Sequence, residues 1–369
     1  MTTTPPGDHL ALHIRSRAEL IAAIPTLIGF TPTDSAVLIG THQHTITTLA
    51  RIDLTDVEDH AADVARHRLL GPADTVELVI IAEPGGRTGV PAGDRADPAG
   101  EHVTPPGREQ VGDRADPGEQ VASPGSEQVG ASVPYARQAA LLTTALAGGG
   151  YHITHAAWIP ALRAGQMVHC YHHNRCGEFL PDPRSTPLAA AAAVAGRVTH
   201  PSRHALAQTL RPDPAHLLGP RAALITTLAA RAADRAANIR LIRTAVARAH
   251  AGHLPTADAD IAELALALTD PAVRDTSLTY SLDHHTRAAQ RLWTTLLRAT
   301  PAPHRAEPAV LLAVTAYLHG DGILAALAAD AALHAHPHLR LATLIHLSLR
   351  SGLPAEQLRA AITETTGTR

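Results

Sequence analysis

The densest group of metal-ligand side chains in the sequence lies in residues 169–176, which read His-Cys-Tyr-His-His-Asn-Arg-Cys. Thiolate and imidazole groups suit tetrahedral zinc, and ligands close together in the chain lose little entropy on binding. However, zinc-binding cysteines are usually separated by about two to four residues, whereas five residues lie between Cys170 and Cys176. A chain with 25 histidines also forms such groups without any metal-binding role. We therefore favour a structural loop and keep zinc as the alternative, with no other cofactor indicated. The zinc hypothesis assigns these ligands: His169, Cys170, His172, His173 and Cys176.

A second polar group lies in the Thr-Pro-Thr-Asp-Ser segment at residues 31–35, between an apolar helical stretch and an apolar strand. Loops at such joints carry many of the binding groups of α/β domains. Asp34 and Ser35 offer an acceptor and a hydroxyl, and Arg51 offers the bidentate geometry that anions favour. The structural alternative, which we favour, is that Asp34 stabilises a turn while Arg51 and Asp53 form one solvated strand face. The candidate binding set is Thr33, Asp34, Ser35, Arg51 and Asp53.

Composition narrows the class of partner. The net charge of −3 argues against nucleic acid, because phosphate binding needs a clustered positive field. No apolar run reaches the length of a membrane span, and the N-terminal MTTTPPGDH lacks a basic and then apolar signal pattern. Two cysteines in 369 residues do not make a disulfide framework. We expect a cytoplasmic protein with no membrane or nucleic-acid partner, and a protein partner is the remaining class.

The N-terminal half alternates helical and strand patterns, which predicts an α/β domain at residues 10–187 with a mixed sheet of about five strands. Pro25 predicts that the first helix ends or kinks near residue 24. Residues 84–133 are dominated by Gly, Pro, Asp, Glu and Arg, and we expect a disordered insert there. The expected strands are residues 36–39 and 45–54, paired as an antiparallel hairpin, and residues 76–82 and 151–159.

The C-terminal half shows only helical patterns. We expect connecting helices at residues 188–255 and an all-α array of helical hairpins at residues 256–369, similar to a helical repeat protein. Residues 221–251 carry an apolar stripe with arginines distributed around it, which predicts one long, solvated helix joining the two halves. All 31 basic residues of the chain are arginine, and genome base composition explains this better than chemistry does.

Three stretches carry a family resemblance. They are RSRAELIAAIPTLIGFTPTDSAVLIG at residues 15–40, residues 170–187 with GRVTHPSR at residues 196–203, and the region from VRD at residues 273–275 to LRSGLPAEQLR near the end. The chain resembles the actinobacterial family known as domain of unknown function 4192. Because that family has no established activity, the resemblance implies no function.

No nucleophile elbow, phosphate-binding loop or dinucleotide glycine pattern occurs in the sequence, so no catalytic set can be assembled. We therefore expect a non-catalytic binding or scaffolding protein, because helical hairpins expose long grooves suited to protein segments. The alternative is an enzyme, or a small-molecule or anion binder, that uses the 31–35 joint with Arg51. A pocket at the joint would favour this alternative, whereas a closed joint would favour the binding protein.

Overall fold

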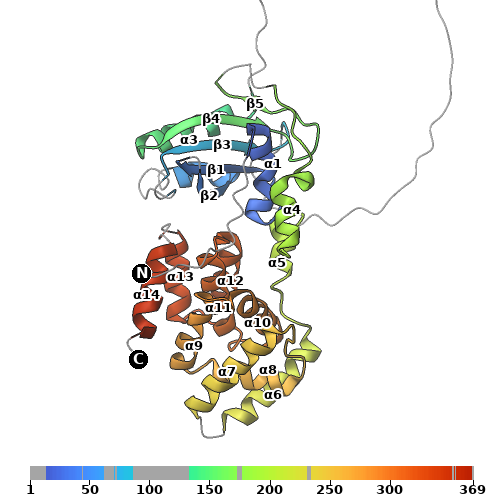
Figure 1. Ribbon diagram of the computed structural model, residues 1–369, viewed down its shortest axis with the longest axis vertical. Helices are drawn as coiled ribbons and strands as arrows, with labels where there is room; N and C mark the ends of the chain where they lie inside the picture. The colour runs from blue at the N-terminus through green and yellow to red at the C-terminus, as the bar shows by residue number, and fades with distance from the viewer. Residues whose placement is uncertain are drawn as a thin grey trace, which may run out of the picture.

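The computed structural model describes residues 14–43, 45–61, 70, 73–85, 133–172, 177–230, 234–350, 353 and 355–367. The expected insert at residues 84–133 lies outside the described residues except at its two ends. Figure 1 shows a sheet region and a helical region, with α4 and α5 running along one side between them. None of the described helices is both long enough and apolar enough to cross a membrane.

The sheet region confirms the expected mixed sheet of five strands. Their order is β2-β1-β3-β4-β5, where β1 is antiparallel to β2 and β3, β3 is parallel to β4, and β5 is a short antiparallel addition to β4. The elements in chain order are α1 (Arg17–Ile28), β1 (Ser35–His42), β2 (Thr45–Asp53), η1 (Leu54–Asp56), β3 (Thr75–Ile81), α3 (Ala136–Gly148), β4 (His152–Ile159), β5 (His169–Cys170) and η2 (Pro183–Ser185).

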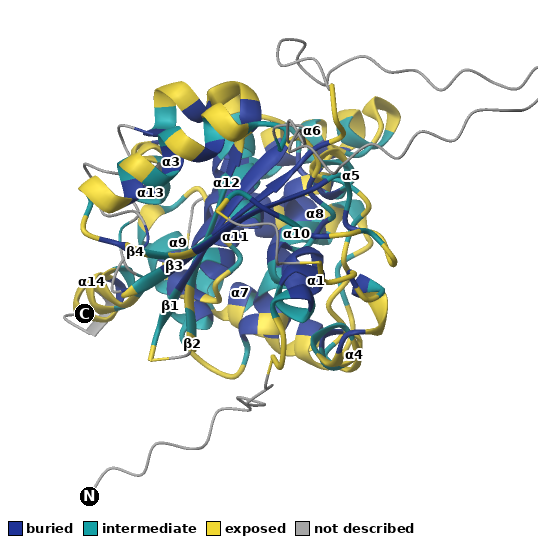
Figure 2. Cartoon of the chain, turned by 90° about the horizontal axis from the view of Figure 1, so that it is seen from above, coloured by how far each residue is buried: buried dark blue, intermediate teal, exposed yellow. Residues whose placement is uncertain are grey.

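The two faces of the sheet are covered by different helices. Val37 and Ile39 of β1 belong to the buried cluster that contains α1, while Ala36 and Leu38 belong to the cluster that contains α3. This alternation follows from the two-residue period of a strand. Seen from above, the three middle strands are buried along most of their length (Figure 2). The apolar run of β3 therefore reflects burial on both faces.

Helix α1 continues through Pro25 to Ile28, so it does not end near residue 24, and the alternative expectation of a kink there stays a prediction. It begins with the Ser16 hydroxyl accepting from the Glu19 N–H, and it ends at Gly29, whose φ of 89° favours glycine. A proline inside a helix costs about 3 kcal/mol. Burying an isoleucine side chain contributes about 1.5–3 kcal/mol, and Ile21, Ile24 and Ile28 are all buried, so packing outweighs the penalty.

The second half of the chain is helix-rich, as expected. Successive helices pack on one another, notably α10 on α11, α11 on α12 and α12 on α13. The elements are α4 (Pro187–Val194), α5 (Arg203–Gln208), α6 (Ala215–Ala229), α7 (Arg235–His250), α8 (Asp258–Ala267), α9 (Pro271–Ser277), η3 (Leu278–Ser281), α10 (Thr286–Ala299), α11 (Ala306–Leu318), α12 (Gly322–Ala335), α13 (Arg340–Arg350) and α14 (Ala355–Gly367). One continuous cluster of buried side chains runs from the α1 face of the sheet into these helices.

The expectation of a single solvated helix at residues 221–251 was wrong. The segment is divided between α6 and α7, and α7 begins at a new N-cap, Asp234, whose carboxylate accepts from the Ala237 N–H. Ile242 and Val246 of α7 are buried in the main core. The stripe of apolar residues is thus a packing face, and the arginines around it belong to two separate helices.

Candidate functional site

The polar joint predicted from the sequence lies at the edge of the sheet where the parallel strands end. Ser35, the first residue of β1, pairs with Asp53 on one side and with Ile81 on the other. Ile81 is the last residue of β3 and pairs with Ile159, the last residue of β4. In α/β sheets this carboxyl edge is the usual place for a ligand. The location therefore matches that of a binding site.

The side chains of the joint satisfy one another. The Arg51 Nε donates to the Ser35 hydroxyl at 2.8 Å, and the Arg51 Nη1 donates to the Asp53 carboxylate at 3.2 Å. The Arg51 guanidinium also lies 5.6 Å from the centre of the Phe30 ring, within the range of a cation–π contact. Ser35 is fully buried, and its hydroxyl donates to the carbonyl oxygen of Thr33. The Ser35 hydroxyl and the Arg51 guanidinium thus bind one another and Asp53, and the binding role expected of the joint stays a prediction.

Asp34 has a structural role that its backbone explains. Its φ of 45° lies in the left-handed region, and its carbonyl oxygen accepts from the Leu54 N–H at 2.9 Å. Asp and Asn adopt this conformation more readily than other non-glycine residues. The structure thus brings the five predicted binding residues together, with Thr33 and Asp34 exposed at the rim.

We expect Asp34→Ala to lower the free energy of unfolding by about 1 kcal/mol, because alanine resists the left-handed conformation. Asp34→Gly should leave the free energy of unfolding nearly unchanged, because glycine adopts positive φ without strain. Chemical denaturation of both variants checks this. An equal loss in both would show that the carboxylate itself makes a stabilising contact.

Next to the joint, three segments far apart in the chain meet, and we call this contact the seam: residues 29–31, 197–200 and Asp321. The Thr31 N–H donates to the carbonyl oxygen of His200, and the His200 N–H donates to that of Gly29. Asp321 caps α12 through the Leu324 N–H at 3.0 Å. Burial raises the pKa of the Asp321 carboxyl above its ordinary value, while the Leu324 N–H and the charges of Arg197 and His200 act in the opposite direction.

The raised pKa of Asp321 predicts a pH dependence. A raised folded pKa means that the folded state binds the proton more tightly, so stability is greatest below the unfolded value of about 3.9 and is lost as pH rises through the folded pKa. Asp321→Asn keeps a capping oxygen and lacks this ionisation. The stability of the unmodified chain relative to Asp321→Asn should fall as pH rises from about 4 to neutrality, as measured by chemical denaturation. A difference that grows with pH would contradict the raised pKa.

Comparison with protein families decides the relationship. The family model described as "Domain of unknown function (DUF4192)" matches residues 18–356. The chain belongs to this family. No curated protein and no solved structure matches it. The DUF4192 match includes the joint, the seam and most of the helical region, so the two regions of the fold form one family unit.

The Cys–His segment of this DUF4192 chain is only partly described, since His173 and Cys176 lie outside the described residues. His169 and Cys170 are consecutive residues of β5, so their side chains point to opposite faces of the strand. The His169 ring lies 5.0 Å from the Trp158 ring, and Cys170 is buried. The zinc hypothesis for this segment stays a prediction.

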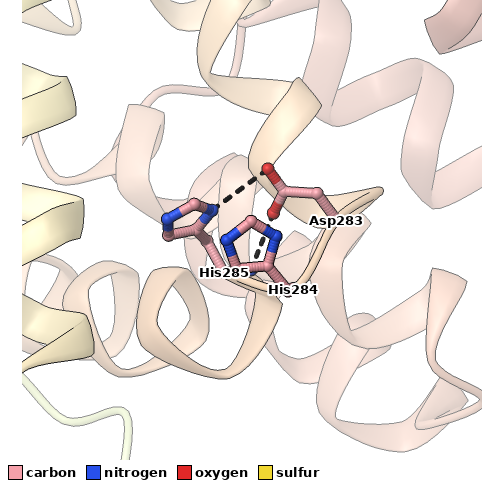
Figure 3. Close-up of side chains that lie close together, drawn as sticks. All are labelled: Asp283, His284 and His285. Carbon is pink, nitrogen blue, oxygen red and sulfur yellow. Dashed lines mark hydrogen bonds and ion pairs between the residues drawn. The ribbon is translucent and has the colours of Figure 1, made fainter.

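The sequence analysis did not identify two groups of polar side chains that the structure brings together. One is a hollow lined by Arg211 and Arg305, and the other contains Asp283 and two neighbouring histidines (Figure 3). The adjacent histidines at 284 and 285 were visible in the sequence, but in a chain with 25 histidines the pair gave no distinct signal. Arg211 and Arg305 are 94 positions apart in the sequence, so they come together only in the folded chain.

Proposed function

We propose that the protein is a non-catalytic binding protein that takes an anionic ligand with an apolar portion. The proposed site is a hollow of about 200 Å³ between α5 and α12, which faces the segment leading into α11. Two arginines and several apolar side chains form its wall: Ala207, Leu210, Arg211, Pro212, Arg305, Leu327 and Ala331. We favour this hollow over the joint at residues 31–35, because Arg51 already has Asp53 as its carboxylate partner.

The position of Arg305 carries this proposal. Its Nε donates to the carbonyl oxygen of Leu297 at 3.1 Å, and its Nη2 donates to that of Leu210 at 3.0 Å. In the described part of the chain no carboxylate forms an ion pair with Arg305, and burial lowers the pKa of its guanidinium. A partly buried cation without a counter-charge is unfavourable. A bound carboxylate or phosphate would supply that charge and accept from the remaining guanidinium N–H groups.

Arg211 adds a second positive charge at the rim. It is exposed, and its Nη1 donates to the Gln208 side chain at 2.8 Å, which holds the guanidinium beside the hollow. Leu327 and Ala331, four residues apart on α12, supply the opposite apolar wall. This combination of an apolar wall and few polar groups is typical of small-ligand sites. The expected ligand class is therefore a carboxylate with an alkyl chain rather than a bare ion.

Isothermal titration calorimetry with octanoate, acetate and inorganic phosphate tests the proposal. We expect saturable octanoate binding that is tighter than acetate binding, because only octanoate also contacts the apolar wall. Arg211→Gln should weaken octanoate binding about ten-fold, the effect of losing one hydrogen bond to a charged group. Arg305→Lys keeps the charge but loses the forked geometry, and it should weaken binding similarly.

Arg240→Gln is the matched control, because Arg240 is an exposed arginine of α7 that does not line the hollow. It should bind octanoate as the unmodified chain does. No saturable binding of any of the three anions, or equal binding by Arg211→Gln and Arg240→Gln, would contradict an anion site in this hollow.

A second candidate function is protein scaffolding, and an apolar pair on α13 favours it. Leu344 and Leu347 lie one turn apart and are 60% and 57% exposed, while Ala342 and Ile345 on the other side of α13 are buried. A helix with apolar residues on both sides commonly packs against a partner on the exposed side. The expected partner is an amphipathic helix of another protein.

A two-hybrid screen with the full chain as bait tests the scaffolding candidate. Partners that bind α13 should be lost with the double variant Leu344→Asp, Leu347→Asp. They should be retained with Val194→Asp, Val198→Asp, which changes another exposed apolar pair, at the end of α4 and just beyond it. Loss in both double variants, or in neither, would contradict binding through α13.

We further propose a cytoplasmic location in an actinobacterium. The resemblance noted in the sequence supports the source, and the scarcity of cysteine supports a compartment without disulfide formation. Fractionation of cells that express the chain with its own N-terminus tests the location. Recovery outside the cytoplasmic fraction would contradict it.

A further inference from the structure

We propose that Asp283, His284, His285 and His250 form a binding site for a divalent transition-metal ion. The first three residues lie in the turn between η3 and α10, and the fourth is the last residue of α7. This site lies apart from the proposed anion hollow, and it does not depend on the proposed function. It also shares no residue with the Cys–His segment at residues 169–176.

Three of these residues already have the spacing that a metal ion requires. Asp283, His284 and His285 each offer one ligand atom, and these atoms all lie within 4.8 Å of one another. Among the described residues, this is the one group of three or more such side chains with that spacing. Figure 3 shows the two imidazole rings beside the Asp283 carboxylate. The centres of the two rings are 3.9 Å apart.

His250 brings a third imidazole to the group from a different helix. Its ring centre lies 5.4 Å from that of His285 and 6.1 Å from that of His284. Both rings approach the His250 ring edge-on. Imidazole binds a metal ion in its neutral form, so several imidazoles can share one ion.

Asp283 orients the side chain of His285. One carboxylate oxygen accepts from the His285 backbone N–H at 2.7 Å, and the other lies 3.2 Å from the His285 Nδ1. A carboxylate on Nδ1 fixes the ring so that Nε2 can bind the metal, the usual arrangement around metal-binding histidines. In the proposed site His284 and His285 bind the ion directly, and His250, which lies outside the group of three with ligand spacing, turns its ring toward the same ion. The Asp283 carboxylate either completes the set or remains the orienting group.

The ligand types limit the choice of ion. Imidazole nitrogen with carboxylate oxygen suits Zn²⁺, Ni²⁺, Co²⁺ and Cu²⁺, whereas Mg²⁺ and Ca²⁺ require oxygen ligands. His284 and His250 are exposed, so the ion would keep an open position to solvent. A bound ion would join the end of α7 to the start of α10, two helices that pack against each other.

Calorimetric titration of tag-free, chelator-treated protein with Zn²⁺ and Ni²⁺ tests the proposal. We expect a single equivalent of either ion to bind, and the thermal unfolding temperature to rise when it does. His250→Ala and His284→Ala should each weaken binding about ten- to hundred-fold. Because both side chains are exposed, each variant should unfold in chelator at the same temperature as the unmodified chain.

Two control variants make the assignment specific. His346→Ala removes a histidine of α13 that pairs with Asp330 at 3.2 Å, and it should leave metal binding unchanged. His172→Ala removes a candidate ligand of the Cys–His segment, and this variant should still bind one equivalent of metal ion. The proposal would be overturned if His172→Ala no longer bound one equivalent of metal ion, or if His250→Ala and His284→Ala both bound it as the unmodified chain does. It would also be overturned if the unmodified chain bound no metal ion.

Discussion

Replacing Phe30 with alanine should lower the free energy of unfolding by about 3–5 kcal/mol, the range for truncating a buried phenylalanine. Phe30 is 1% exposed and lies in the core between α1 and β1. Its ring supports the Arg51 guanidinium, and the residues on either side of it, Gly29 and Thr31, hold His200. In a chain with only 2% aromatic residues, few neighbouring side chains are large enough to fill the cavity left by its loss.

The chain supplies its own control, because it has only one other phenylalanine. Phe179 is 63% exposed, and Phe179→Ala should change the free energy of unfolding by less than about 0.5 kcal/mol. Chemical denaturation of both variants gives the comparison. Similar losses in the free energy of unfolding would mean that Phe30 contributes no more to packing than the exposed Phe179 does.

Replacing Arg221 with methionine should lower the free energy of unfolding by about 3–5 kcal/mol, because it removes a buried cation that binds two partly buried carboxylates and a carbonyl oxygen. The Arg221 side chain is only 7% exposed. Its guanidinium donates to Asp213 at 2.9 Å, to Asp258 at 2.8 Å and to the carbonyl oxygen of Ala299 at 3.0 Å. These partners precede α6, begin α8 and end α10, so one side chain joins three helices.

An exposed ion pair of the same types provides the matched comparison. The Nε of Arg235 lies 2.8 Å from Asp270, but its side chain is 64% exposed. Arg235→Met should therefore cost no more than about 1 kcal/mol, as is usual for ion pairs in water. Thermal and chemical unfolding of both variants test the difference. Equal losses would show that burial does not strengthen the Arg221 interactions.

The local pattern of the sequence determined most of the secondary structure. The apolar run of β3 and the hairpin of β1 and β2 follow from strand periodicity, which acts over a few residues. The caps at Ser16 and Asp270 likewise depend on neighbouring N–H groups and can be read from the sequence alone. The mixed sheet, the helix-rich second half and the family were accordingly predicted correctly.

Tertiary packing decided what the polar residues do. Helix α1 continues through Pro25 because its isoleucines are buried. The free energy of that burial cannot be read from the position of the proline in the sequence. Arg221 was expected on a solvated helix, but partners at 213 and 258 place it in the interior. Arg51 contacts Asp53, Ser35 and the ring of Phe30, so the polar groups of the joint bind one another. The local pattern records which residues form a helix or strand, whereas the partner of a charged side chain depends on segments far away in the chain. For that reason the Arg305 hollow and the approach of His250 to His284 emerge only in the folded protein.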